Sequence, residues 1–154
     1  MKLSKNLTLI EVTRSESAKR NGIDNTPTPK HLENLKVIAN RIFQPIREYF
    51  KTSINISSGY RSEKLNRLVP GTSLTSQHST GEALDIDMDG TKIKNSQVFH
   101  YIKDTLEFDQ LIWEFGDEVN PGWVHVSYKA DGKQRKQVLR AIKKNGDVKY
   151  IPYK

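Results

Sequence analysis

Residues 76–85 read Ser-Gln-His-Ser-Thr-Gly-Glu-Ala-Leu-Asp, and residues 123–125 read Trp-Val-His. Together they supply two imidazoles, His78 and His125, and the carboxylate of Asp85. A catalytic zinc ion takes three protein ligands of this kind and leaves its fourth position to water. We therefore expect a fold that brings the two segments together around one metal ion.

The segment around Asp85 has the alternating pattern of a β-strand. In a strand over residues 83–88, Leu84 and Ile86 point to one side and Asp85 to the other, toward the metal site. The acidic residues from Asp85 onward also resemble the start of a calcium loop. The twelfth position of that loop, Ser96, lacks the bidentate glutamate of an EF-hand, so we reject the calcium interpretation.

The second histidine lies in a predicted antiparallel hairpin. Residues 110–115 and 123–128 alternate like strands, and Asn-Pro-Gly at residues 120–122 marks the loop between them. Alternation places Glu114 on the same face of its strand as Ile112, and His125 on the same face of its strand as Trp123 and Ser127. Since neighbouring strands lie about 5 Å apart, Glu114 can reach the metal site.

A long amphipathic helix is predicted before these strands. Thr28 can cap this helix and Pro29 can occupy its first position. Apolar residues then recur every three or four positions. They are Leu32, Leu35, Ile38, Ile42, Ile46 and Tyr49. We expect a kink near Pro45.

Arg61 follows a short predicted strand. The strand covers residues 53–57, and Ser62 can cap a short helix over residues 63–68. A guanidinium at the end of a strand can give a carboxylate two parallel hydrogen bonds, which lysine cannot reproduce. We therefore favour substrate binding for Arg61.

In the C-terminal part, the sequence pattern predicts a helix over residues 96–106 and a hairpin whose strands cover residues 137–142 and 148–151. Asn145-Gly146 is a strong signal for the turn of that hairpin. The basic stretch 133–144 is interpreted as a solvated face of the sheet. The expected fold is a small single α+β domain over residues 1–154, with a mainly antiparallel sheet and helices packed on one side.

The composition allows one core and limits the partners. The chain has 154 residues, no cysteine and a net charge of +7. It lacks the basic stripe with interleaved aromatic residues that single-strand binders use, so no nucleic acid is expected as a partner. No apolar run is long enough for a signal peptide or a membrane span, so we expect cytoplasmic synthesis and no membrane insertion. A monomer is expected.

His31 and His100 lie in polar helical patterns and are expected at the surface.

Three motifs together resemble the zinc D-alanyl-D-alanine carboxypeptidases and phage endolysin peptidases, the LAS metallopeptidases that share the hedgehog-like fold. The motifs are Ser-Gly-Tyr-Arg-Ser at residues 58–62, the block of residues 76–85, and Trp-Val-His-Val-Ser at residues 123–127. The resemblance covers nearly the whole chain. It implies that His78, Asp85 and His125 bind Zn²⁺, that Arg61 receives a substrate carboxylate or carbonyl, and that the substrate is the peptide of peptidoglycan.

The resemblance also implies an acidic residue that activates water. Many relatives carry it three residues before the last zinc histidine, but that position is Gly122 here. We therefore assign the base to Glu114, as in the hedgehog-like arrangement, with Asp117 and Glu118 as alternatives. The expected reaction is hydrolysis of a stem peptide, by a carboxypeptidase or by an endolysin-type endopeptidase.

Three further residues are predicted to contact the substrate: Tyr60, Ser76 and Trp123. Ser76 can also fix the loop before His78, whereas alternation buries Trp113. Because Gly122 is not acidic, a non-catalytic, zinc-stabilised binding module of a phage particle or cell surface stays open as an alternative. An enzyme of this kind without an export signal would reach the cell wall by phage-type release.

Overall fold

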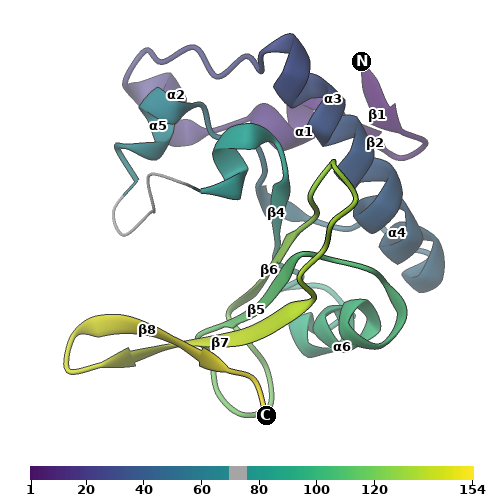
Figure 1. The fold of residues 1–154 in the computed structure, drawn as a ribbon, viewed down its shortest axis with the longest axis vertical. Coiled ribbons are helices and arrows are strands. Elements are labelled where there is room, and N and C mark those ends of the chain that lie inside the picture. Colours follow the sequence, from purple (N-terminus) through teal and green to yellow (C-terminus); the bar gives the residue numbers. More distant parts are fainter. Residues whose placement is uncertain (70–75) are drawn as a thin grey trace.

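The computed structural model describes residues 1–69 and 76–154, and a six-stranded sheet organises them (Figure 1). The strand order is β3-β4-β6-β5-β7-β8. The strands are β3 (Ile56–Ser58), β4 (Ala83–Ile86), β5 (Gln110–Glu114), β6 (Trp123–Ser127), β7 (Gln137–Lys144) and β8 (Asp147–Pro152). A separate two-stranded sheet joins β1 (Lys2–Ser4) and β2 (Leu7–Thr8).

The helices are concentrated before the main sheet and in one later segment. They are α1 (Leu9–Thr13), α2 (Glu16–Arg20), α3 (Pro29–Ile38), the π-helix η1 (Ala39–Phe43), α4 (Gln44–Phe50), α5 (Glu63–Asn66), the 3₁₀-helix η2 (Gln77–Thr80) and α6 (Asn95–Thr105). Within the described residues, no helix combines the length and apolar character that crossing a membrane requires.

Strand pairing confirms the predicted fold class. Every pair in the large sheet is antiparallel except β5 with β7, which run parallel. The hairpins β5–β6 and β7–β8 both form as predicted. At the second turn, Asn145 and Gly146 have φ angles of 53° and 83°, the positive values that a two-residue hairpin turn of this type requires.

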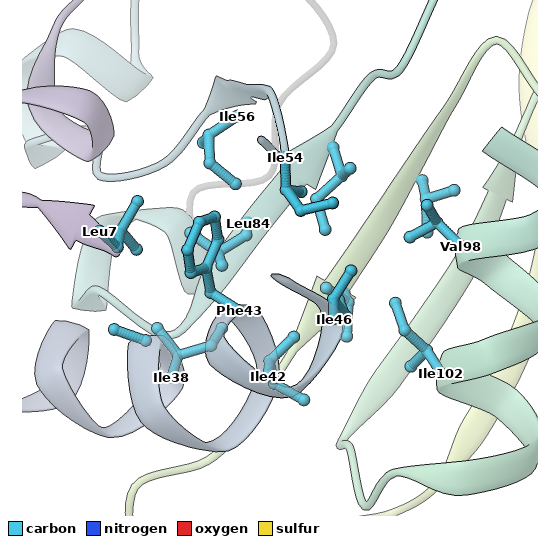
Figure 2. Close-up of a cluster of buried hydrophobic side chains, with 14 of the residues drawn as sticks. Leu7, Ile38, Ile42, Phe43, Ile46, Ile54, Ile56, Leu84, Val98 and Ile102 are labelled. Atoms are coloured by element: carbon cyan, nitrogen blue, oxygen red, sulfur yellow. The ribbon is translucent and has the colours of Figure 1, made fainter. Parts of the chain in front are cut away.

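One hydrophobic core lies between the sheet and its helices. Figure 2 shows Ile42, Phe43 and Ile46 of the long helical segment packed toward Leu84 of β4, with Ile102 of α6 beside them. Each is at most 1% exposed, and burying a side chain of this size stabilises the fold by about 2 kcal/mol. Because Leu84 faces this core, the alternate residues of the sheet are left for the opposite face.

The long helix is interrupted where the kink was expected. Pro45 has no N–H to donate to the carbonyl group four residues earlier. The turn before it widens into η1, in which the N–H of Gln44 donates to the carbonyl of Ala39, five residues back. The segment continues as α4 and ends at Lys51, which has a φ of 53°.

Some predicted boundaries were wrong. The predicted strand over residues 53–57 begins later, at Ile56, because its pairing with β4 starts there and Asn55 instead directs its side-chain amide to the carbonyl of Asp87. Helix α5 ends at Asn66, two residues before the predicted end. Helix α6 lies one residue earlier than predicted at each end.

Candidate metal centre

The three predicted ligands converge on one face of the sheet. Asp85 of β4 lies directly opposite His125 of β6, and η2 brings His78 to the same place. Oδ1 of Asp85 lies 3.3 Å from Nε2 of His78 and 3.0 Å from Nδ1 of His125. One potential ligand atom from each residue lies within 4.8 Å of the other two, so among the described residues these three could hold a metal ion.

The two separations from Asp85 fit a tetrahedral zinc site. With Zn–N and Zn–O bonds of roughly 2.0–2.1 Å, two ligand atoms of a tetrahedron stand about 3.3 Å apart. The two separations from Asp85, 3.3 Å and 3.0 Å, are close to that value. Three protein ligands leave one position for water or substrate, as in catalytic rather than structural zinc sites.

His78 is oriented for metal binding by a backbone carbonyl. Its Nδ1 lies 2.6 Å from the carbonyl oxygen of Gly59, to which it donates when neutral, so that Nε2 presents its lone pair to Asp85 and the metal position. The side chain is 2% exposed, and burial lowers the pKa of His78 despite the opposing charge of Asp85. Burial thus favours loss of the ring proton, and the neutral imidazole is the form that binds a metal.

Asp85 is held in its ionised form. Burial by itself would raise the pKa of this carboxyl group. When the imidazoles carry their protons, the charge of His78 and the hydrogen bonds from His125 and His78 outweigh burial and hold the pKa of Asp85 far below its ordinary value. An anionic carboxylate between two imidazoles is the charge state that a divalent cation requires.

Arg61 lies beside this group with an unsatisfied donor. Its Nε is buried and has no hydrogen-bond partner within residues 1–69 and 76–154. Its backbone N–H donates to the carbonyl oxygen of His78 at 3.1 Å, which ties Arg61 to η2. Burial lowers the pKa of Arg61 while the nearby charge of Asp85 raises it. A buried guanidinium donor without a partner fits an incoming carboxylate or carbonyl oxygen.

Glu114 shares the face of the metal group. Ile112, two residues earlier on β5, lies opposite His125, so Glu114 is a diagonal neighbour of that histidine. Its side chain is 6% exposed, and burial, assisted by the charge of Asp85 and opposed by that of His125, raises the pKa of Glu114 to about 7. A carboxyl group with that pKa can exchange a proton near neutral pH.

The two alternative acids have other partners. The carboxylate of Asp117 accepts hydrogen bonds from the backbone N–H groups of Val119 and Asn120 in the exposed turn. Glu118 is paired with Arg140 at 2.7 Å and its side chain is 85% exposed. Neither is shown to face the metal group, so Glu114 stays our candidate.

The remaining predicted residues divide between core and site. Trp113 is buried, as predicted, at 2% exposure. Trp123 is half-buried and lies opposite Glu114 on β6. Ser76 caps η2 by accepting a hydrogen bond from the N–H of His78 at 3.2 Å, which agrees with a loop-fixing role.

Tyr60 does not fit its predicted role as a substrate contact. It is 4% exposed and packs in the core, and its hydroxyl lies 3.0 Å from Nδ1 of His31. The prediction that His31 is a plain surface residue was wrong as well, because its ring is half-buried against Tyr60. His100 is exposed, as predicted.

Two supporting residues were missed. Asn25 donates to the carbonyl oxygen of Tyr60 and accepts from the N–H of Ser62, so it fixes both neighbours of Arg61. Asp109 is fully buried and binds Gln77, the residue before His78, as well as Arg135. Nothing in the local sequence distinguishes either from an ordinary loop residue, because their partners are distant along the chain.

Comparison with known proteins agrees with this geometry. No curated protein sequence matches the chain. The profile of the family described as Peptidase M15 matches residues 5–127, most of the chain, including the three ligands, Arg61 and Glu114. The match confirms the resemblance to the zinc peptidases. The chain therefore belongs to the Peptidase M15 family of zinc metallopeptidases.

Proposed function

We propose that this protein hydrolyses the stem peptides of peptidoglycan with a zinc ion held by His78, Asp85 and His125. The observation that carries the proposal is the placement of the His78–Asp85–His125 group and the buried carboxyl group of Glu114 on one face of the sheet, with the half-buried Arg61 beside them. The Peptidase M15 family supports the metallopeptidase chemistry. The peptidoglycan substrate and the action on the cell wall after phage-type release are our proposals.

A zinc ion at this site would lower the pKa of a bound water to roughly 7 and polarise a carbonyl oxygen. Glu114 takes a proton from the attacking water and delivers it to the leaving amine, for which a pKa of about 7 is well matched. Arg61 binds a carboxylate or carbonyl oxygen of the peptide through the Nε that has no partner in the described part of the chain. Trp123 forms part of the pocket wall next to Glu114.

The metal site is tested by titrating the chelator-treated protein with zinc and measuring heat. The wild-type protein is expected to bind one zinc ion per chain. His125→Ala removes one of the three ligands and should abolish binding and hydrolysis together. His100→Ala is the matched control because His100 is exposed and outside the ligand group. Hydrolysis that survives in a zinc-free His125→Ala protein would contradict the proposal.

The reaction is tested by incubating the zinc-loaded protein with defined muropeptides and analysing the products by mass spectrometry. Chelator-sensitive loss of a terminal D-alanine would establish a carboxypeptidase, and release of a longer peptide would establish an endopeptidase. Glu114→Gln should lower kcat by about 10²-fold or more, whereas Glu118→Gln, in the exposed pair with Arg140, should not change it.

A binding module is the competing outcome. It is favoured by Gly122, whose added Cβ would lie 3.2 Å from the carbonyl oxygen of Glu114, so this tight turn has little room for the acid that many relatives carry there. Bound zinc without cleavage of any muropeptide would establish this alternative.

A further inference from the structure

One row of side chains extends the face of the metal site beyond β5. In strand register, Trp123 of β6 lies opposite Glu114 of β5, Glu114 opposite Ala141 of β7, and Ala141 opposite Tyr150 of β8. Directly paired residues project from the same face of a sheet. Tyr150 therefore shares a face with Glu114, two strands away.

Ala141 leaves space between these two side chains. It is fully buried although it lies on the face that carries the metal group, and its single methyl group is the only side chain in the row between Glu114 and Tyr150. A larger residue there would separate the carboxyl group from the phenol. The small side chain of Ala141 instead leaves room between them.

Tyr150 lies on the face that carries the metal group. In a flat sheet, β8 would lie four strand spacings from β4, roughly 19 Å, but only two from β5, which carries Glu114. Burial raises the pKa of Tyr150, and the charges of Glu114 and Asp85 raise it further. The phenol therefore keeps its proton at neutral pH and can donate a hydrogen bond, while the residue as a whole is 53% exposed.

The hairpin that carries Tyr150 lies outside the family match, which ends at Ser127. In Figure 1 the yellow β7–β8 hairpin continues the sheet on the side away from β3 and β4. The family match therefore does not cover this hairpin, whose register places Tyr150 on the same face as the site.

We propose that the β7–β8 hairpin forms one wall of the substrate site and that Tyr150 binds the peptide by donating a hydrogen bond to one of its carbonyl or carboxylate oxygens. The inference rests on the proposed peptidase function and adds a specificity-determining residue to it. Arg61 follows β3 at one end of the strand order and Tyr150 lies on β8 at the other, with the metal group between them. A bound peptide thus runs across the strands, and Tyr150 holds the part on the far side of the scissile bond from Arg61.

The test compares steady-state kinetics of the zinc-loaded wild type, Tyr150→Phe and Tyr150→Ala on a muropeptide and on the dipeptide that contains only its scissile bond. Removing the hydroxyl should raise KM for the muropeptide about fivefold, the loss of roughly one hydrogen bond, with kcat within twofold. The dipeptide, which does not reach Tyr150, should show no change in KM. Lys149→Ala is the control, because Lys149 is exposed on the other face of β8.

A second measurement separates this inference from the proposed function. The dissociation constant of the intact muropeptide is measured by calorimetry on zinc-loaded Glu114→Gln, with and without Tyr150→Phe. An approximately fivefold weaker affinity supports the contact even if the wild type hydrolyses nothing, which would overturn the proposed function alone. An unchanged KM and an unchanged dissociation constant in the Tyr150 variants would overturn the inference while leaving the peptidase function intact. Tyr150→Phe keeps the ring, so its result does not depend on whether Tyr150→Ala folds.

Discussion

The carbonyl oxygen of Gly59 lies 2.6 Å from Nδ1 of His78, 19 residues along the chain. Gly59 can sit there because it has no side chain: an added Cβ would lie 2.6 Å from the carbonyl oxygen of Val12. The N–H of the next residue, Tyr60, donates to that same oxygen. Close packing against α1 thus sets the orientation of a metal ligand.

Gly59→Ala is predicted to weaken zinc binding. The new methyl group forces the backbone away from Val12, and the carbonyl that orients His78 moves with it. Loss of such a supporting contact typically costs 10- to 100-fold in metal affinity. Zinc titration of the chelator-treated variant checks this value. Gly22→Ala is the control for general destabilisation, since the φ of Gly22, +61°, strains an alanine while its added Cβ has no neighbour within 4 Å; an equal loss of affinity in both variants would contradict the prediction.

The face of the metal site could be predicted because it depends on local alternation. Asp85, Glu114 and His125 each lie in a strand whose period of two is visible in the sequence, and β5 and β6 pair as expected. The Asn145-Gly146 turn was equally predictable, since few dipeptides accept two positive φ angles.

What could not be predicted depends on contacts between distant segments. Asn25 supports Arg61 across 35 to 37 positions of the chain, and no local pattern announces such a pairing. Tyr60 was predicted to contact the substrate, but its side chain is buried in the core. The role proposed for Tyr150 depends on the parallel pairing of β5 with β7, which the hairpin signals alone do not determine.

Asp109→Asn is predicted to lower both stability and zinc affinity. The fully buried carboxylate accepts hydrogen bonds from Arg135 at 2.8 Å and from Gln77 at 3.1 Å. In Asp109→Asn the side-chain amide replaces the charge-assisted hydrogen bonds of the carboxylate with neutral ones. Its NH₂ group also faces Arg135 or Gln77, both of which are donors. Because Arg135 is half-exposed, we expect a loss of about 2 kcal/mol in the free energy of unfolding.

The effect of Asp109→Asn on zinc follows from the position of Gln77 next to His78. Urea unfolding measures the loss of stability, and zinc titration measures a several-fold rise in the dissociation constant. Asp104→Asn is the control, because its pair with Lys103 is exposed and screened by solvent, so its loss should leave the stability nearly unchanged. Normal zinc affinity in a destabilised Asp109→Asn protein would restrict Asp109 to a role in folding.

Glu114 is predicted to set the acidic limb of the pH profile. Only its ionised form accepts a proton from water, so kcat/KM should rise with pH through the pKa of Glu114 and then level off. That pKa is about 7 without metal, and a divalent cation nearby lowers it, so the limb is expected below pH 7 in the zinc-loaded protein. The residual activity of Glu114→Gln should lose this limb; if the limb persists unchanged, another group is the base.

The same carboxyl group should make the metal-free protein less stable as the pH rises. Its pKa is raised from an ordinary 4.5 to about 7 by burial, so between these pH values the folded state binds more protons than the unfolded state, and the free energy of unfolding falls with pH. Each tenfold change in the ionisation equilibrium corresponds to about 1.4 kcal/mol, so the fall is on the order of 3 kcal/mol. The new side chain in the Glu114→Gln variant cannot ionise, so this variant should be more stable than the wild type above pH 7. The difference in free energy of unfolding should vanish near pH 4.

Urea unfolding of both chelator-treated proteins at pH 5 and pH 8 checks this difference. Equal stability of the two proteins at pH 8 would show that burial does not destabilise the ionised form of Glu114.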